Sequence, residues 1–188
     1  LGPVPAREDP RDALVSVRWS SLETLPRGAK VGTSSLRRSA QIRALRPDLE
    51  VVDLRGNVDT RIRKVSDGVV DGAVMACAGL RRLGHGDVIR QAIEPEVMVP
   101  AVSQGALGLE VREGDAQTLA WLAPLGDEAT TLEIRAERTL LAALEGGCQV
   151  PIGALARVKG DTITLVGCVA SVDGASRLKA RAEGPWAE

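Results

Sequence analysis

The 188-residue sequence contains no tyrosine and no phenylalanine, and its aromatic side chains are three tryptophans. This scarcity argues against single-stranded nucleic-acid binding, which depends on aromatic side chains that stack on bases. The formal net charge is −1, so the chain also lacks the basic excess that is typical of nucleic-acid-binding domains. Apolar runs are too short to cross a bilayer, and no secretory apolar region is recognised. We therefore expect a cytoplasmic protein that binds neither membrane nor nucleic acid.

Cysteine and histidine are also scarce. The three cysteines are odd in number and widely spaced, which argues against a disulfide framework and against a cysteine-based zinc site. Cys77 and Cys168 lie in apolar runs, which predict buried strand residues. The single histidine, His85, lies between two glycines and is expected in a surface turn. The sequence therefore predicts no metal site.

Cys148 differs from the other two cysteines in its surroundings. It follows Gly146-Gly147 at the end of a predicted helix, and Pro151 comes three residues after it. This context predicts an irregular, accessible loop. A thiol on such a loop is suited to covalent chemistry, because nearby arginines would favour the reactive thiolate.

The first half of the chain alternates short strands with helices three times. Strands are predicted at 30–32, 51–54 and 72–77. Helices are predicted from Leu36 and from Val58, and a short basic helix is expected to stop at Gly84. This alternation predicts βαβ units and a mainly parallel sheet.

Arginines occupy the junctions between these strands and helices. They are Arg37, Arg38, Arg55, Arg61, Arg81 and Arg82. Because the carboxyl ends of the strands of an open α/β sheet lie at one edge, we expect these side chains to line one cleft. The hydroxyls of Thr33, Ser34 and Ser35 and the helix N–H groups would add donors for an anion. Guanidinium groups bind carboxylates bidentately, so the predicted ligand carries several carboxylates.

Other interpretations of the arginines remain open at this point. An arginine on a helix is most often part of a solvated face, and this is expected of Arg43, Arg46, Arg63 and Lys64. The arginines between residues 36 and 46 could instead bind RNA, with strongly salt-dependent affinity. A non-catalytic anion-binding module of the periplasmic-binding-protein type would account for the cleft but not for Cys148.

The second half of the chain has a different character. The segment 100–111 is expected to be an irregular crossing that leads into a strand, and a short helix is expected at 117–122. A long helix is predicted from the N-cap Asp127 to Gly146-Gly147, followed by strands at 153–158 and 162–169 with a tight turn between them. The chain is thus predicted to end in a separate α+β unit, with one helix against an antiparallel sheet.

Several segments together resemble the porphobilinogen deaminase (hydroxymethylbilane synthase) family. They follow one another in the family's order along nearly the whole chain, and the segment around Cys148 is the most specific of them. The matching segments are 7–13 (REDPRDA), 33–38 (TSSLRR), 54–61 (LRGNVDTR), 78–84 (AGLRRLG), 100–105 (PAVSQG) and 137–153.

The resemblance implies a transferase of tetrapyrrole (haem) biosynthesis. Members of that family condense four porphobilinogen units onto a covalent dipyrromethane primer, with loss of ammonia, and release hydroxymethylbilane. The primer is joined by a thioether to the cysteine that matches Cys148. The implied fold is a periplasmic-binding-protein-like domain with a parallel or mixed sheet at 1–105, followed by a small α+β domain at 127–188 that carries this cysteine.

The resemblance also implies roles for individual residues. Cofactor and substrate carboxylates would be bound by Thr33, Ser34, Ser35, Arg37, Arg38, Arg55, Gly56, Arg61 and Arg82, and Gln104 would lie at a hinge. The family's catalytic aspartate has no match here, so no catalytic residue is assigned. We expect a fragment without most of the family's first domain, to which 106–126 would be the return segment, and we expect it to be inactive alone. The implied protein is a monomer with porphobilinogen as its small-molecule substrate and a transient hand-over of product to the next enzyme.

Overall fold

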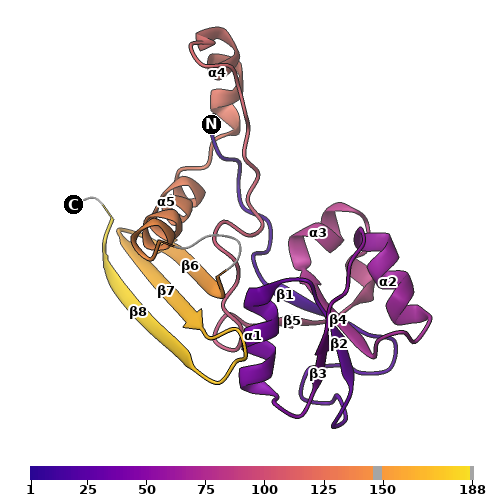
Figure 1. Ribbon diagram of the computed structural model, residues 1–188. Helices are drawn as coiled ribbons and strands as arrows, with labels where there is room; N and C mark the ends of the chain where they lie inside the picture. Colours follow the sequence, from indigo (N-terminus) through magenta and orange to yellow (C-terminus); the bar gives the residue numbers. More distant parts are fainter. Residues whose placement is uncertain (146–149, 187–188) are drawn as a thin grey trace.

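The computed structural model describes residues 1–145 and 150–186. The described residues form a five-stranded sheet in the first half of the chain and a three-stranded sheet at its end, with helix α1 (Leu36–Leu45) between the two (Figure 1). None of the described helices has the length and apolar character that a membrane span requires.

The five-stranded sheet is mixed. Its strands are β1 (Asp12–Val15), β2 (Lys30–Gly32), β3 (Glu50–Val52), β4 (Gly72–Ala76) and β5 (Ile89–Ile93), in the order β3-β2-β4-β1-β5. The three predicted strands are present as β2, β3 and β4, and β2 pairs parallel with both of the others. β1 and β5 were not predicted, and β1 runs antiparallel to both β4 and β5. The amino end of β1, at Asp12, therefore lies at the same edge as the carboxyl ends of β2, β3 and β4.

Helices cover both faces of this sheet. α1, α2 (Val58–Ser66) and α3 (Cys77–Arg82) follow the three parallel strands, and a short 3-10 helix, η1 (Gly86–Val88), precedes β5. Successive residues of β1 point to opposite faces, so Leu14 packs with Ile42 of α1 while Val15 packs with Leu80 of α3. Cys77 is buried as predicted, but it is the first residue of α3 rather than a strand residue.

The two helices that border the predicted cleft begin at side-chain caps. Ser35 accepts a hydrogen bond from the backbone N–H of Arg38 (3.4 Å) at the start of α1, and Asn57 accepts one from that of Thr60 (2.9 Å) at the start of α2. Such caps satisfy N–H groups that have no partner inside the helix. They fix where each helix begins and hence which arginines face the sheet edge.

An extended arm leaves the sheet near Arg7 and ends in α4 (Ala116–Leu122) and the short η2 (Ala123–Leu125), at the top of Figure 1. The first residues of the chain run beside it, since the N–H of Gly2 donates to the carbonyl of Leu109 (2.7 Å). Within the described residues 94–115 no strand forms, so the expectation that the crossing over 100–111 leads into a strand was wrong. The short helix at 117–122 is confirmed by α4.

The end of the chain forms the predicted α+β unit. α5 (Glu128–Ala143) packs against a sheet of order β6-β7-β8, in which β6 (Ile152–Lys159), β7 (Thr162–Ala170) and β8 (Arg177–Pro185) are antiparallel. Asp127 caps α5 by accepting from the N–H of Thr130 (2.7 Å), as expected. α5 ends at Ala143, before the predicted Gly146-Gly147, and β8 was not predicted.

The small unit is joined to the first sheet by close backbone contact. The N–H of Ala154 donates to the carbonyl of Pro100 (3.0 Å), and a Cβ on Gly153 would lie 2.7 Å from the carbonyl oxygen of Val99. A glycine is therefore required where β6 meets the crossing.

Candidate carboxylate-binding site

The site predicted from the sequence lies at the carboxyl edge of β2, β3 and β4. Thr33 follows β2, Arg55 comes three residues after β3, and α3 begins directly after β4. These loops are neighbours because β2 is paired with both β3 and β4. The structure thus brings three of the predicted segments to one side of the sheet, as is typical of ligand sites in α/β proteins.

The Thr33–Ser35 loop is held rigidly. The N–H of Thr33 donates to the carbonyl of Val52 in β3 (3.0 Å), and its hydroxyl accepts from the N–H of Ser35 (3.2 Å). Thr33 is buried, whereas the Ser34 side chain is exposed and accepts from Nη2 of Arg61 (3.2 Å). Ser34 is therefore the hydroxyl of this loop that faces a ligand most directly.

Arg61 is oriented by the turn before its helix. Its Nε donates to the carbonyl of Gly56 (2.8 Å), and Nη2 reaches Ser34. Gly56 has φ of +123°, and a Cβ there would lie 2.8 Å from Cγ2 of Thr60, so the turn requires glycine. Arg61 is thereby fixed on the side of Ser34, with Nη1 available to an anion.

Arg55 lies beside a small cavity. Its side chain is 86% exposed and donates from Nε to Asp53 (2.8 Å). The cavity has a volume of about 310 Å³, and four predicted residues, Thr33, Ser34, Ser35 and Arg55, are among its lining residues. The structure therefore places these four side chains around one shared space.

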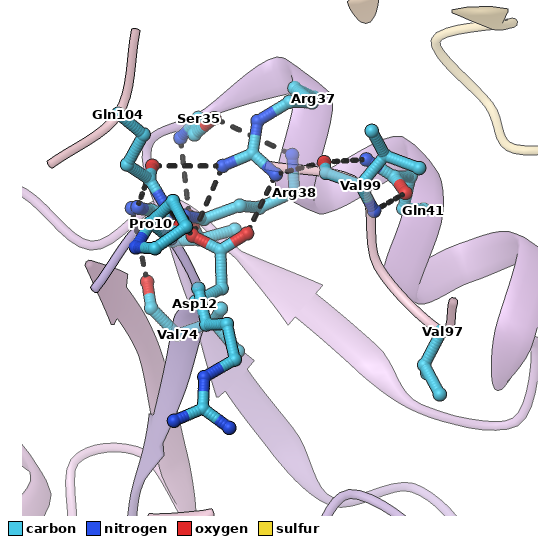
Figure 2. Close-up of polar contacts among 12 residues, drawn as sticks. Pro10, Asp12, Ser35, Arg37, Arg38, Gln41, Val74, Val97, Val99 and Gln104 are labelled. Carbon is cyan, nitrogen blue, oxygen red and sulfur yellow. Dashed lines mark hydrogen bonds and ion pairs between the residues drawn. The ribbon is translucent and has the colours of Figure 1, made fainter. Parts of the chain in front are cut away.

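Arg37 and Arg38 lie deeper and share a buried carboxylate, that of Asp12 (Figure 2). Arg37 donates from Nη1 and Nη2 to Asp12 (2.6 and 3.1 Å) and from Nη1 to the carbonyl of Val99 (2.8 Å). Arg38 donates from Nε to Asp12 (2.8 Å). The Nη donors of Arg37 are thus bound within the protein, and its first role in this structure is to orient the edge.

The electrostatics of this cluster follow from its burial. Burial raises the pKa of Asp12, but the positive charges of Arg37 and Arg38 outweigh it and the net shift is downward. Burial lowers the pKa of Arg38, partly offset by Asp12, and the nearby charges of Arg37 and Arg61 lower it further. The positive charge of Arg61 thus acts on Arg38, so the exposed and the buried arginines of the site are electrostatically coupled. An added anionic group would relieve this repulsion among three cations.

Gln104, the predicted hinge residue, connects three segments. Its Nε2 donates to the carbonyl of Pro10 (2.6 Å) and to Asp12 (3.0 Å), while Oε1 accepts from Arg38 (3.2 Å) and Arg37 (3.4 Å). Gln104 therefore ties the crossing to the start of β1 and to α1. Its role as a hinge stays a prediction.

The other predicted residues are less closely connected to this cluster. Arg81 and Arg82 lie in the last turn of α3, so their predicted place at the start of this helix was wrong. The exposed side chain of Arg82 makes no hydrogen bond or ion pair with residues 1–145 or 150–186. Its neighbour Arg81 instead pairs with Glu8 (3.3 Å) and Asp9 (3.1 Å). Cys148, the predicted attachment point, lies outside the described residues. Nε2 of His85 lies 2.8 Å from Oδ1 of Asp59 in a turn, consistent with the surface position expected for it.

The residue that sequence reasoning missed is Asp12. It is fully buried and lies directly before the apolar residues Ala13, Leu14 and Val15. An acidic residue at the start of an apolar strand is an unusual placement, because a buried carboxylate requires a partner. The acidic residue at the start of an apolar strand could have been recognised in the sequence as a carboxylate that needs a buried cation. In the structure the arginines of α1 are these cations.

The donor set fits a ligand with several carboxylates. Arg55, Arg61 and Ser34 present donors at the surface, and Arg38 lies behind them. Among the described residues no cluster of histidine, cysteine or acidic side chains has the arrangement of a metal site. The chemistry that this edge can perform is therefore the binding and orientation of anionic groups.

Comparison with known proteins agrees with this geometry. Residues 1–120 match the family model described as porphobilinogen deaminase, dipyromethane cofactor binding domain, and residues 131–188 match that of the porphobilinogen deaminase C-terminal domain.

Curated proteins named porphobilinogen deaminase are similar to this chain. That of Roseiflexus castenholzii is 55% identical over 174 residues, which are 93% of this chain and 57% of the relative. That of Syntrophotalea carbinolica is 52% identical over 185 residues, 98% of this chain and 59% of the relative. That of Syntrophobacter fumaroxidans is 47% identical over 188 residues, all of this chain and 61% of the relative. The chain thus spans 57% to 61% of the length of these relatives.

Proposed function

This chain belongs to the porphobilinogen deaminase family, and we propose that it supplies the cofactor- and substrate-binding surface of a hydroxymethylbilane synthase. The reaction joins porphobilinogen units head to tail onto a dipyrromethane primer, with loss of ammonia, until hydroxymethylbilane is released. The primer, when bound, supplies the terminal pyrrole to which the next unit is added. In this reaction the residues of the carboxylate-binding site would bind and align the polycarboxylate chain.

The observation that carries this proposal is the fixed guanidinium of Arg61 beside the exposed Arg55 and Ser34. Arg61 is held by the Gly56 carbonyl and by Ser34, so it meets a carboxylate without first losing much side-chain freedom. Arg55 lines the same cavity as Ser34 and can bind a second carboxylate. A single anionic group would not need two such donors, whereas pyrroles with acetate and propionate side chains would use both.

The buried residues would act through these exposed ones. Asp12 and Arg37 hold the amino end of β1 against α1, and Arg38 lies between them and Arg61. We assign Arg37 chiefly to positioning and Arg38 to the binding of the innermost carboxylate. Arg82 would bind carboxylates from the α3 side. Cys148 would carry the primer through a thioether.

The arm over 106–126 has a separate place in the proposal. Trp121 is 69% exposed, and Leu107 and Leu125 are also exposed on this arm. Apolar side chains gathered on an extended segment are suited to packing against further protein. In the relatives, which are longer than this chain, the corresponding arm would contact the remaining part, and Gln104 would lie at the hinge between the two.

The proposal is tested by intact mass spectrometry after incubation of the chain with a preformed aminomethyl dipyrromethane, so that attachment requires only displacement of ammonia by the thiol and no condensation step. We expect a mass increase equal to two pyrrole units joined to the thiol, because the primer is a dipyrromethane. Cys148→Ser should abolish the increase, while Cys168→Ala, which changes a buried thiol in β7, should retain it. An adduct of the same mass on Cys148→Ser, or none on the unaltered chain, would contradict the assignment.

A further inference from the structure

A second cleft lies between the β6-β7-β8 sheet and the segments around Asp9 and Glu94. Its volume is about 660 Å³, against about 310 Å³ for the cavity beside Arg55. This volume is within the range of small-molecule sites in proteins, about 300–1,000 Å³. The lining residues of the two spaces do not overlap, so the larger cleft is a separate feature of the fold.

The floor of the cleft is an apolar strip on the sheet. Leu155 of β6 is directly opposite Val166 of β7, and Val166 is directly opposite Arg181 of β8. Arg157 of β6 lies one row further along, opposite Thr164. Since neighbouring strands are about 4.8 Å apart and the two rows are about 6.7 Å apart along the strands, the Cα atoms of Arg157 and Arg181 are about 12 Å apart, on either side of this strip.

Both guanidinium groups keep donors for a ligand. Arg157 uses Nη1 to bind Glu133 (3.0 Å), and Arg181 uses Nη2 to bind Glu183 (2.7 Å). A guanidinium has five N–H donors in a fixed plane, so each retains Nε and one further nitrogen. Lys179 closes one end of the cleft by donating to the carbonyls of Pro95 (3.2 Å) and Glu96 (2.9 Å).

The opposite wall carries three carboxylates, of which two share one cation, Arg11. Arg11 donates from Nη2 to Asp9 (2.8 Å) and from Nη1 to Glu94 (2.5 Å). The third, Glu96, belongs to the end that Lys179 closes. The lining carries four cations and three carboxylates, and Arg157 and Arg181 each also pair with a glutamate outside the lining. The cleft therefore offers an organic anion the remaining guanidinium donors above an apolar floor, rather than a net positive charge.

We propose that this cleft binds a small aromatic dicarboxylate, with its ring on Leu155 and Val166 and its carboxylates at Arg157 and Arg181. A flat ring covers the apolar strip, and a rigid spacing between two carboxylates suits two guanidiniums fixed on separate strands. Binding of a rigid ligand also costs less conformational entropy than binding of a flexible chain. The assignment does not depend on the proposed function, because no cleft residue belongs to the site beside Arg55.

The test uses benzene-1,3-dicarboxylate as the probe, titrated into the whole chain. We expect saturable shifts of the Leu155 and Val166 methyl signals in NMR spectra, and weaker binding of glutarate, which has the same charge but no ring. Arg181→Glu should weaken binding by about tenfold or more, because a bidentate contact is replaced by repulsion. The Arg181 side chain is 66% exposed, so this variant is expected to fold.

A matched control is available on the outer face of α5. Arg135→Glu makes the same change of charge at an exposed position outside the cleft, and it should leave the affinity unchanged. Equal affinities of Arg181→Glu and Arg135→Glu, or methyl signals that do not shift, would overturn the proposal. If affinity for the probe falls with Arg61→Gln rather than Arg181→Glu, the probe binds at the carboxyl-edge site. The cleft assignment is then wrong, while the proposed function stands.

Discussion

Asp12 determines how the arginines of α1 are arranged. One carboxylate accepts from Arg37, Arg38 and Gln104, each at 3.1 Å or less for its shortest contact. Because the group is fully buried, its charge is tolerable only while these partners remain in place. The orientation of Arg38 is therefore set by a carboxylate that is itself fully buried.

We expect Asp12→Asn to lower the free energy of unfolding by about 3–5 kcal/mol, because the buried guanidinium of Arg37 loses its counter-charge. Urea denaturation at neutral pH measures this change. Asp53→Asn provides the control, since Asp53 pairs with Arg55 in a largely exposed position, and such pairs contribute at most about 1 kcal/mol.

The pH dependence of this difference follows from the lowered pKa of Asp12. A carboxyl whose folded pKa lies below its unfolded value of 3.8 stabilises the fold fully above that value. The stabilisation is lost as the pH falls through the folded pKa. The difference between the unaltered chain and Asp12→Asn should therefore be constant near neutral pH and shrink below about pH 4. A difference that stays the same in strong acid would show that Asp12 acts through packing alone.

The sequence predicted where the arginines lie but not what each one contacts. Helical spacing places Arg37 and Arg38 in the first turn of α1, as observed. It does not show that Arg37 turns inward to a carboxylate 25 positions earlier in the chain. Which guanidinium meets the interior depends on the antiparallel strand β1, and that strand was not predicted.

Helix α2 offers an internal comparison between a held arginine and a free one. Arg61 donates to the Gly56 carbonyl and to Ser34, whereas the exposed side chain of Arg63 contributes no hydrogen bond to residues 1–145 or 150–186. Both residues carry the same charge on the same helix. A ligand that is bound by specific contact should distinguish them, and one attracted only by charge should not.

We expect Arg61→Gln to weaken porphobilinogen binding about five- to tenfold, because a charge-assisted hydrogen bond is removed. Arg63→Gln should change the affinity by less than about twofold, since an exposed charge at that distance is screened by salt. Isothermal titration calorimetry of the two variants makes the comparison. Equal losses of affinity would mean that the site beside Ser34 is not the carboxylate site.

Among the elements that the sequence predicted, α2, α5, β6 and β7 have a hydrophobic period and are present. α1 is present too, but its buried face includes Arg37, Ser39 and Gln41. β8 was missed although its sequence alternates: charged residues at 177, 179, 181 and 183 are separated by apolar residues at 178, 180 and 182. Its apolar residues are exposed nonetheless, so the strand is held mainly by its pairing with β7, from Ala170–Arg177 to Thr162–Pro185.

At the scale of the whole molecule, one buried ion pair holds the two sheets and the arm together. Arg7 donates to Glu137 of α5 (2.6 and 3.2 Å) and to the carbonyl of Gln104 (2.9 Å). Glu137 also accepts from the N–H groups of Ser103 (2.7 Å) and Ala156 (2.9 Å). The partners are 130 positions apart, so no local pattern could have predicted the pair. It nevertheless joins four segments at one point.

We expect Glu137→Gln to separate the unfolding of the two sheets. The variant leaves Arg7 with only its longer contact to Glu133 (3.5 Å) as a counter-charge, which costs about 3 kcal/mol at the junction, while each sheet keeps its own core. Differential scanning calorimetry should then show two transitions, and hydrogen exchange should protect β2 and β6 to different extents. Glu128→Gln, at an exposed position of the same helix, should behave like the unaltered chain. A single transition at an unchanged midpoint in Glu137→Gln would mean that the contacts of Gly153 with Val99 and Pro100 suffice to couple the two sheets.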